Sequence, residues 1–406
     1  MIPQTNTTRE LPQTRGLPYF ARLLLPVAAR LDWGSLALSL PGGRHIDIKG
    51  KAPGKHAELH IKDYACLWRL ARTGNLGFAE GYLAHEWETP NLTALLEVFA
   101  RNADRMNELY EGRWWAKLAN RLAHAFKRNT RAGARRNIHA HYDLGNAFYQ
   151  RWLDPSMTYS SAKFEAPSQP LNEAQRNKYR SLARRIDLRP EHRLLEIGCG
   201  WGGFAEFAAK EIGCHVTGIT ISREQYEFAK SRLADAGLAD KTDIRLEDYR
   251  DTQGTFDRIV SIEMFEAVGE AYWPEYFAKI QSSLAPGGQA GLQIITIDER
   301  YFPSYRAGVD FIQKYVFPGG MLPTMTALRE QVAAAGLAWR DNTTFGLDYA
   351  QTLESWRERF LGAWDDIRTL GFDEKFKRMW SYYLSYCEAG FRAGSIDVTQ
   401  VALART

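Results

Sequence analysis

The chain has 406 residues, of which 45% are hydrophobic and 25% are charged, and its formal net charge is +4. At about 150 residues per domain this length predicts two or three domains, and the composition excludes a collagen, a coiled coil and a disordered chain. No apolar run reaches the roughly 20 residues of a membrane-spanning helix, and the polar N-terminus lacks the charged-then-apolar order of a secretory signal. We therefore expect a cytoplasmic protein.

Neither the cysteines nor the histidines indicate a metal site. The four cysteines are scattered and include no C-x-x-C pair, which argues against a zinc site and a disulfide framework. His139 and His141 form an H-x-H pair, but no cluster of acids or cysteines accompanies them. We predict reduced thiols and no bound metal.

The first hundred residues are expected to form a small mixed α+β domain. Alternating segments at residues 35–40 and 44–48 flank Pro41-Gly42-Gly43, which predicts a hairpin, and residues 57–61 predict a further strand. Helices are expected at residues 64–71 and 92–109.

Residues 113–136 combine basic and aromatic side chains and contain no acidic residue. In the first half, Trp114 and Trp115 are followed by Leu118, Leu122 and Phe126 at helical spacing, so one face is apolar and another basic. This pattern suits peripheral binding to an anionic phospholipid surface, at about 1 kcal/mol per basic residue. A core-facing helix followed by a solvated basic linker is the alternative. No recognisable nucleic-acid-binding module is present, so we predict no nucleic-acid partner.

The domain boundary is expected in this basic stretch. We predict an N-terminal lipid- or membrane-associated domain at residues 1–126, a basic linker at 127–136 and a second domain at 137–406. From residue 193 short apolar strands alternate with helices, which is typical of a parallel sheet with crossover helices. The expected strands are residues 194–197, 216–221, 244–246, 256–262 and 290–297, and the expected helices are 204–211, 223–236 and 272–284.

A glycine-rich loop follows the first of these strands. Gly198, Gly200 and Gly203 satisfy G-x-G-x-x-G, the dinucleotide fingerprint, but the second strand does not end in the acid that would hold a ribose. The acid lies instead two residues before the first glycine, as Glu196. The pattern E-x-G-x-G-x-G resembles the S-adenosylmethionine loop of class I methyltransferases, and we favour that interpretation over a dehydrogenase.

Several further motifs resemble those of cyclopropane-fatty-acyl-phospholipid synthases and mycolic acid cyclopropane synthases. They are the stretches 141–149 and 153–161, Thr220-Ile221-Ser222 with Gln225, Asp248-Tyr249-Arg250-Asp251, Met264-Phe265-Glu266, Phe317-Pro318-Gly319-Gly320 and Tyr382-Tyr383-Leu384. The resemblance covers residues 137–392, and Gly77-Phe78-Ala79-Glu80 with Glu86-Trp87-Glu88 extends it into the N-terminal domain.

The resemblance implies an α/β fold, with a Rossmann-like class I methyltransferase domain and a smaller N-terminal mixed α+β domain. The implied reaction transfers a methyl group from S-adenosylmethionine to the double bond of unsaturated fatty acyl chains of phospholipids, giving cyclopropane fatty acids. The protein would then lie at the inner face of the membrane, and because members of that family often dimerise, a homodimer is a possible partner state. The implied cofactor contacts come from Tyr142, Tyr159, Ser160, Glu196, Gly198, Gly200, Gly202, Thr220, Gln225, Asp248 and Tyr249.

The same resemblance implies a bound bicarbonate ion as the base that removes the proton on ring closure. It would be surrounded by Glu266, Tyr349, Ser161, Gln293 and Ile295. Two of these depart from the family pattern, since Ser161 replaces a cysteine and Gln293 a histidine. Both side chains can still donate hydrogen bonds to an anion, but an amide cannot titrate or pass a proton.

Three alternatives stay open, and the first two follow from these departures. The same methyl transfer can give a methyl-branched or methylene-bearing chain without ring closure. The chain can be a non-catalytic lipid-binding homologue, although its intact cofactor loop argues against this. It can also be a methyltransferase for soluble small molecules.

Overall fold

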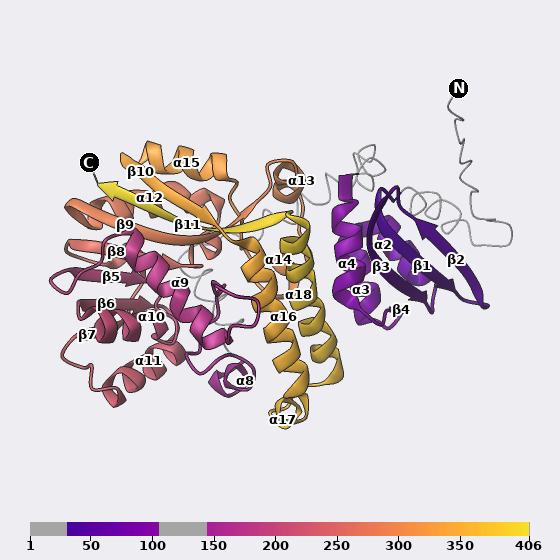
Figure 1. Ribbon diagram of the computed structural model, residues 1–406, viewed down its shortest axis with the longest axis horizontal. Helices are drawn as coiled ribbons and strands as arrows, with labels where there is room; N and C mark the ends of the chain where they lie inside the picture. The colour runs from indigo at the N-terminus through magenta and orange to yellow at the C-terminus, as the bar shows by residue number, and fades with distance from the viewer. Residues whose placement is uncertain (1–30, 105–143, 406) are drawn as a thin grey trace. The chain divides into compact units, whose positions relative to one another are not determined.

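The computed structural model describes residues 31–104 and 144–405, which belong to two compact units (Figure 1). One unit contains residues 31–104 and the other residues 144–405. The basic segment 113–136, the predicted linker and Tyr142 lie outside the described residues, so what was inferred for them stays a prediction.

The N-terminal unit contains a four-stranded sheet in the order β2-β1-β3-β4. Strand β1 (Trp33–Leu40) pairs antiparallel with β2 (Arg44–Lys49) and parallel with β3 (Ala52–Ile61), and β3 pairs with the short β4 (Trp87–Glu88). The expected hairpin is therefore confirmed. Its turn contains Gly42 and Gly43 with φ of +89° and +81°, a conformation that glycine adopts without a Cβ penalty.

Three helices complete this unit, and they are α2 (Ala65–Thr73), α3 (Asn75–Leu83) and α4 (Leu92–Arg101). The sequence predicted α2 and α4 but not α3. The core of the N-terminal unit includes an aromatic pair, in which the fully buried Trp87 stacks on Phe78 with ring centroids 4.2 Å apart.

The second unit is built on a seven-stranded sheet in the order β10-β11-β9-β8-β5-β6-β7. Strands β5 to β9 are parallel, as the alternation of strands and helices predicted. They are β5 (Arg193–Ile197), β6 (His215–Thr220), β7 (Thr242–Leu246), β8 (Phe256–Ile262) and β9 (Leu284–Ile297). Two further strands, β10 (Leu337–Thr344) and β11 (Ile396–Arg405), add antiparallel pairing beside β9 and were not predicted.

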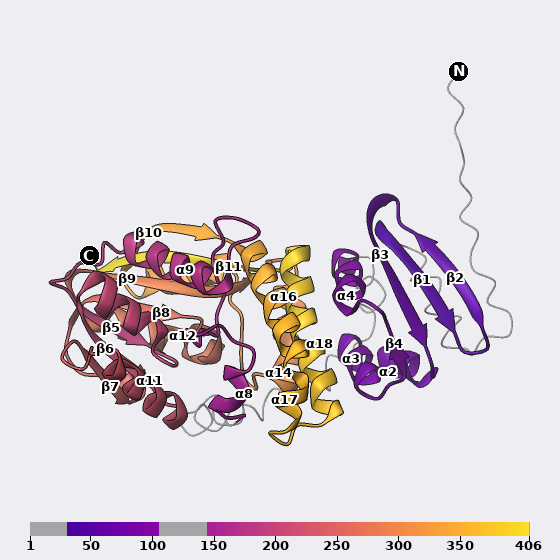
Figure 2. The same cartoon turned by 60° about the horizontal axis from the view of Figure 1, so that its bottom comes forward.

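Helices cover the sheet and form one additional layer, in which α16 and α18 lie side by side in both views (Figures 1 and 2). The predicted crossover helices are present as α10 (Gly203–Phe207) with the π-helical turn Ala208–Ile212, α11 (Arg223–Asp235) and α12 (Trp273–Ser283). The remaining helices are α8 (Asn146–Gln150), α9 (Leu171–Arg185), α13 (Phe302–Ala307), α14 (Phe311–Tyr315), α15 (Met325–Ala334), α16 (Gly346–Gly362), α17 (Trp364–Arg368) and α18 (Glu374–Ala393).

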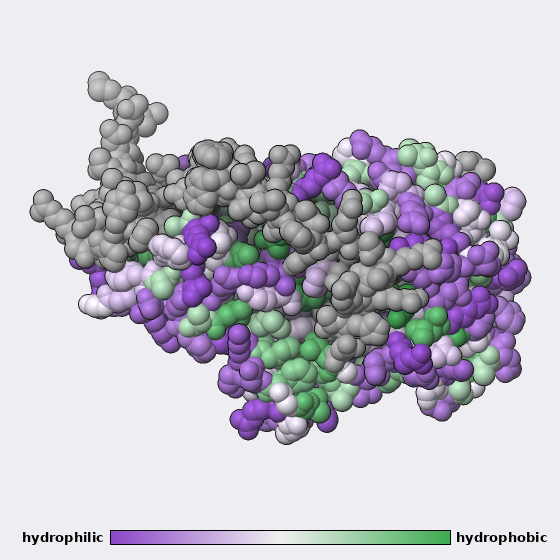
Figure 3. Space-filling model, turned by 180° about the vertical axis from the view of Figure 1, so that it is seen from behind, coloured by the Kyte–Doolittle hydropathy of each residue, from purple (hydrophilic) through white to green (hydrophobic). Residues whose placement is uncertain are grey.

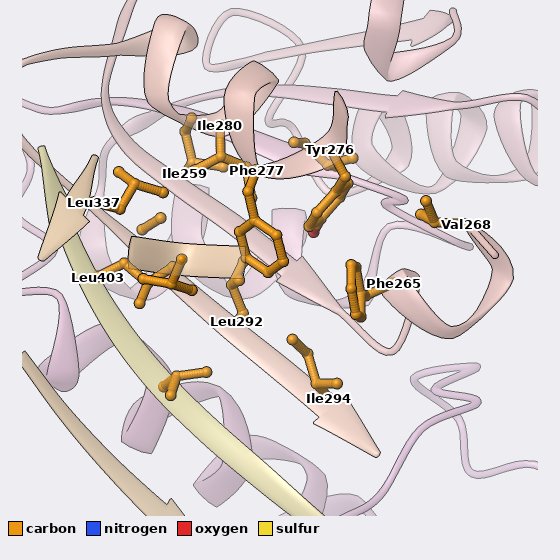
Figure 4. Close-up of a cluster of buried hydrophobic side chains, with 14 of the residues drawn as sticks. Ile259, Phe265, Val268, Tyr276, Phe277, Ile280, Leu292, Ile294, Leu337 and Leu403 are labelled. Carbon is orange, nitrogen blue, oxygen red and sulfur yellow. The ribbon is translucent and has the colours of Figure 1, made fainter. Parts of the chain in front are cut away.

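A hydrophobic cluster between α12 and the sheet fixes the segment that follows β8 (Figure 4). Phe265 lies in this cluster, with its ring centroid 5.0 Å from that of Tyr276 and 5.2 Å from that of Phe277. Ile294 of β9 points into the same cluster. Because side chains alternate along a strand, its neighbours Gln293 and Ile295 face the other side of the sheet.

The surface of the second unit is mixed. Figure 3 shows mainly hydrophilic residues, with apolar side chains gathered along the lower edge of that face. Leu361 at the end of α16 and Leu370 just after α17 are among the exposed large hydrophobic residues. Within residues 31–104 and 144–405, no helix combines the length and the apolar character needed to cross a bilayer. The same residues contain no cluster of histidine, cysteine and acidic side chains suited to a metal ion.

Candidate active site

The glycine loop lies at the carboxyl end of β5, the edge where open parallel sheets bind ligands. Gly198, Gly200 and Gly202 have φ of +80°, +53° and +82°, so each has a conformation that favours glycine. A Cβ at Gly198 would also come within 2.8 Å of the Met264 side chain. The loop therefore depends on glycine for its backbone path, and it leads directly into α10.

Glu196 supplies a buried carboxylate at the start of this loop. Its Oε2 atom has no hydrogen-bond partner among the described residues. Burial raises the pKa of Glu196 well above its usual range, and the positive charge of Lys178 opposes this shift. A buried oxygen of this kind fits a ligand that brings its own donors, as the ribose hydroxyls or the amino group of S-adenosylmethionine would.

The second strand and its loop hold polar groups beside the glycine loop. Thr220 donates a 2.9 Å hydrogen bond to the Gln225 side chain, and the Ser222 side chain caps α11 by accepting from the Gln225 N–H. Asp248, after β7, is paired with Arg250 through hydrogen bonds of 2.9 and 2.6 Å. The neighbouring Tyr249 packs against Tyr276. The carboxyl ends of β5 and β6 and the segments that follow β5, β6 and β7 therefore carry the predicted cofactor residues other than those of the segment before α9.

That segment contributes Tyr159 and Ser160. The Tyr159 hydroxyl forms a 2.8 Å hydrogen bond with that of Tyr383 on α18. Ser160 accepts a 2.6 Å hydrogen bond from the fully buried Lys178 ammonium group. Burial lowers the pKa of Lys178 to about 7, although Glu263, Asp154 and Glu196 favour its charge.

A second cluster of polar residues is centred on the carboxylate of Glu263, just after β8. Its Oε1 accepts hydrogen bonds from the Ser161 backbone N–H at 2.8 Å and from Gln293 Nε2 at 2.7 Å. Its Oε2 accepts a 2.6 Å hydrogen bond from the Tyr349 hydroxyl. Three donors from three distant segments thus converge on one carboxylate, which is the arrangement expected around an anion.

The backbone explains why Glu263 points to these donors. Its φ of +50° lies in the left-handed region, and its N–H donates a 2.8 Å hydrogen bond to the Gln293 carbonyl of β9. Phe265, two residues later, is held in the hydrophobic cluster. The left-handed conformation costs about 1–2 kcal/mol for a residue with a Cβ, so the surrounding contacts must stabilise it.

Gln293 is held in one orientation by a chain of hydrogen bonds. Its Oε1 accepts from Gln400 Nε2 of β11 at 3.0 Å, and Gln400 Oε1 accepts from Ser181 at 2.8 Å. Gln293 and Gln400 are fully buried. These hydrogen bonds leave the Gln293 amide nitrogen facing Glu263, so Gln293 acts as an oriented hydrogen-bond donor.

Glu266 lies beside Glu263 and is bound on one side only. Its Oε1 accepts a 2.5 Å hydrogen bond from the Ile295 N–H, while its Oε2 has no partner among the described residues. Burial raises the pKa of Glu266 to about 8, and the charge of Glu263 adds to this shift. Two neighbouring carboxylates therefore share an environment that favours a single negative charge.

The residues predicted around the anion are thus brought together by the fold. Ser161 takes part through its backbone N–H, because its hydroxyl donates instead to the Ala162 carbonyl at 2.9 Å. Ile295 also acts through its backbone. Sequence reasoning missed Glu263, although this acid immediately follows a predicted strand end, a position that can be read as a ligand-binding edge.

The comparisons with known proteins agree with this geometry. A family model described as mycolic acid cyclopropane synthetase matches residues 129–401. The chain is 40% identical over 347 residues to the tuberculostearic acid methyltransferase UfaA1 of Mycobacterium tuberculosis (strain ATCC 25618 / H37Rv), with 83% of this chain and 80% of the relative covered. It is 36% identical over 387 residues to the cyclopropane-fatty-acyl-phospholipid synthase of Escherichia coli (strain K12), with 92% and 94% covered.

A solved structure extends this agreement to the fold. The crystal structure of mycolic acid cyclopropane synthase CmaA1 complexed with SAH and CTAB aligns with a TM-score of 0.63 and 29% identity, covering 66% of this chain and 98% of that one. The predicted class I methyltransferase fold and the choice of S-adenosylmethionine over a dinucleotide are thereby confirmed. Together these matches show that the chain is an S-adenosylmethionine-dependent methyltransferase that belongs to the mycolic acid cyclopropane synthetase family.

Proposed function

We propose that the enzyme transfers a methyl group to the double bond of an unsaturated acyl chain in a membrane phospholipid and closes a cyclopropane ring. The observation that carries this proposal is the similarity to the Escherichia coli phospholipid synthase, which spans 92% of this chain. That alignment is longer than the second unit, so it includes part of the N-terminal domain. The mycolic acid synthase structure covers only 66% of the chain.

The name of another relative suggests a different product. UfaA1 is named as a methyltransferase rather than a cyclopropane synthase, and its identity to this chain is 40%. A methyl-branched or methylene-bearing acyl chain therefore remains the alternative product. Both products arise from the same cation and differ in the bond from which the proton is lost.

The loops after β5, β6 and β7 would hold the cofactor. Glu196 offers the unpartnered carboxylate oxygen, and the glycine loop lets the ligand approach the backbone. When bound, S-adenosylmethionine supplies an electrophilic methyl group. The chain's own contribution is to hold the double bond in line with that methyl group and to exclude water, because an alkene is a weak nucleophile.

Aromatic rings pack around Tyr349, the tyrosine that donates to Glu263, and they suit the positive charge that develops on the acyl chain. Tyr349 stacks on Phe391 with centroids 4.4 Å apart and meets Trp356 edge to face. Tyr159 also packs against Trp356 at 5.2 Å. Ring faces attract cations by about 0.5–2 kcal/mol each, so this shell would stabilise a carbocation without reacting with it.

The membrane contact is proposed for the basic and aromatic segment 113–136, which lies outside the described residues. Its composition supports peripheral binding at the inner, anionic face of the membrane of a cytoplasmic enzyme. The apolar surface in Figure 3 adds a candidate contact for acyl chains on the second unit.

Labelled methyl transfer tests this function directly. The enzyme is incubated with methyl-labelled S-adenosylmethionine and vesicles of unsaturated phospholipid, with vesicles of the matched saturated phospholipid as the control. We expect label in the acyl chains of the unsaturated vesicles only. Label that appears in soluble small molecules and does not need vesicles would contradict the proposal.

A further inference from the structure

The donors expected to hold bicarbonate already bind a carboxylate of this chain. The Ser161 N–H, Gln293 Nε2 and the Tyr349 hydroxyl all donate to Glu263, at 2.6–2.8 Å. A carboxylate presents the same pair of negatively charged oxygens as bicarbonate. The residues present therefore do not fit a second anion in this place.

The charges around Glu263 also argue against an additional anion. Glu266 adjoins the same group of residues, and burial together with the charge of Glu263 raises its pKa to about 8, so the single negative charge of the pair resides on Glu263. Lys178 is the cation whose charge acts on Glu263, and its ammonium group donates to Ser160. A bicarbonate would bring a second negative charge beside that of Glu263, at a high cost in a buried environment.

The backbone at Glu263 favours the same conclusion. With a φ of +50°, glycine would fit this position with less strain than any residue with a side chain. A glutamate here costs conformational energy and then directs its carboxylate to three donors. Retained strain of this kind points to a role for the side chain itself.

We propose that the Glu263 carboxylate is the built-in base of this enzyme and replaces a bound bicarbonate ion. The proposal rests on the methyl transfer proposed above. Once a methyl group has been added to one alkene carbon, the other carries the positive charge. A C–H bond of the added methyl group then breaks, its electron pair forms the last ring bond, and the proton passes to a Glu263 oxygen. The protonated side chain returns its proton to solvent before the next turnover.

Two substitutions at this residue separate an internal base from an external one. Glu263→Gly removes the carboxylate, relieves the strained backbone and leaves the three donors for an added anion. Glu263→Gln removes the base but keeps the donors occupied. Both variants are assayed in CO2-free buffer and with millimolar bicarbonate, with Glu330→Gln on the exposed face of α15 as the matched control.

We expect wild type and Glu330→Gln to turn over equally with and without bicarbonate. Loss of a general base lowers turnover by about 100- to 10,000-fold, so both Glu263 variants should be slow in CO2-free buffer. Added bicarbonate should raise the turnover of Glu263→Gly by at least about tenfold over its value in CO2-free buffer. It should leave the turnover of Glu263→Gln unchanged. Line broadening of ¹³C-bicarbonate should likewise appear with Glu263→Gly and be absent with wild type.

Wild-type turnover that collapses in CO2-free buffer would overturn the proposal, and so would full activity of Glu263→Gly in that buffer. Calorimetric binding of S-adenosylmethionine shows that each variant is folded. If a variant loses this binding, the proposal is judged from wild type alone, by whether its turnover depends on bicarbonate and whether it broadens the ¹³C-bicarbonate line. Absence of methyl transfer by wild type under every condition would instead refute the proposed function.

Discussion

The Tyr349 hydroxyl donates a 2.6 Å hydrogen bond to Glu263 Oε2, across 86 positions of sequence. Tyr349 lies on α16 and Glu263 follows β8, so this bond joins the helical layer to the edge of the sheet. Burial and the negative charge of Glu263 raise the pKa of Tyr349 well above its usual range, so the phenol keeps its proton and remains a donor. The pair thus links the aromatic shell to the proposed base.

Tyr349→Phe tests the contribution of this bond. A hydrogen bond to a charged group contributes about 1.5–3 kcal/mol, so we expect turnover to fall by about 10- to 100-fold. Binding of S-adenosylmethionine, measured by calorimetry, should not change. Tyr226→Phe on α11 is the matched control. Equal activity of Tyr349→Phe and wild type would show that the bond does not support the reaction.

Of the two other donors to Glu263, Gln293 uses its side chain and Ser161 its backbone N–H, which gives a second prediction. Gln293→Leu removes a side-chain donor, whereas Ser161→Ala keeps the backbone N–H that contacts Glu263. Turnover should fall far more for Gln293→Leu than for Ser161→Ala. Gln293→Leu should also lose about 1–3 kcal/mol of stability, because it deprives buried polar groups of a partner. The reverse order of turnover rates would mean that the Ser161 hydroxyl acts directly.

Glu266 predicts a pH dependence of stability. Its pKa is about 8 in the folded protein against 4.5 for the ordinary group, so the folded state binds the extra proton between these values. Stability contributed by this group is therefore lost as the pH rises from about 5 to about 8. In Glu266→Gln this loss is absent. The melting temperature of the variant relative to wild type should accordingly be higher at pH 8 than at pH 5, and a difference that does not change with pH would contradict the assignment.

The parallel half of the sheet could be predicted because its strands and helices leave a local apolar pattern. The glycine loop and Glu196 were found because the motif E-x-G-x-G-x-G is also local in sequence. Strand β11 was missed, since its pairing with β9 and β10 joins residues far apart in sequence and carries no local signal. The two long helices α16 and α18 were not predicted, and the sequence indicated only Tyr349 in α16 and the motif Tyr382-Tyr383-Leu384 in α18.

Glu263 shows why the centre of the site was harder to predict. The motif directed attention to Glu266, three residues later, and both acids have similar sequence surroundings. What distinguishes Glu263 is its left-handed backbone and the convergence of Ser161, Gln293 and Tyr349 on its side chain. Neither property is encoded in a short stretch of sequence, because both depend on tertiary packing.

The proposed membrane segment predicts a salt-sensitive interaction. Reversing the charges of Arg113, Lys117 and Arg121 to glutamate should remove at least about 3 kcal/mol of binding to anionic vesicles, which is roughly 100-fold at low salt. Binding to neutral vesicles should change little. Sedimentation of the protein with vesicles at several salt concentrations measures both effects.

A matched set of reversals controls for net charge. Lys210, Lys230 and Lys241 are exposed on the second unit, and their replacement by glutamate changes the total charge by the same amount. If this control set weakens vesicle binding as much as the first, the effect belongs to the overall charge and the segment 113–136 is not the membrane contact.

The product of the reaction tests the central claim most directly. The enzyme is incubated with unsaturated phospholipid vesicles and deuteromethyl S-adenosylmethionine, and the fatty acid esters are analysed by mass spectrometry before and after hydrogenation. We predict an added carbon that keeps two of the three deuterium atoms and resists hydrogenation, as a cyclopropane ring does. Labelled chains that take up hydrogen would show a methyl-branched alkene or a methylene product instead, and acyl chains without label would contradict methyl transfer to lipid altogether.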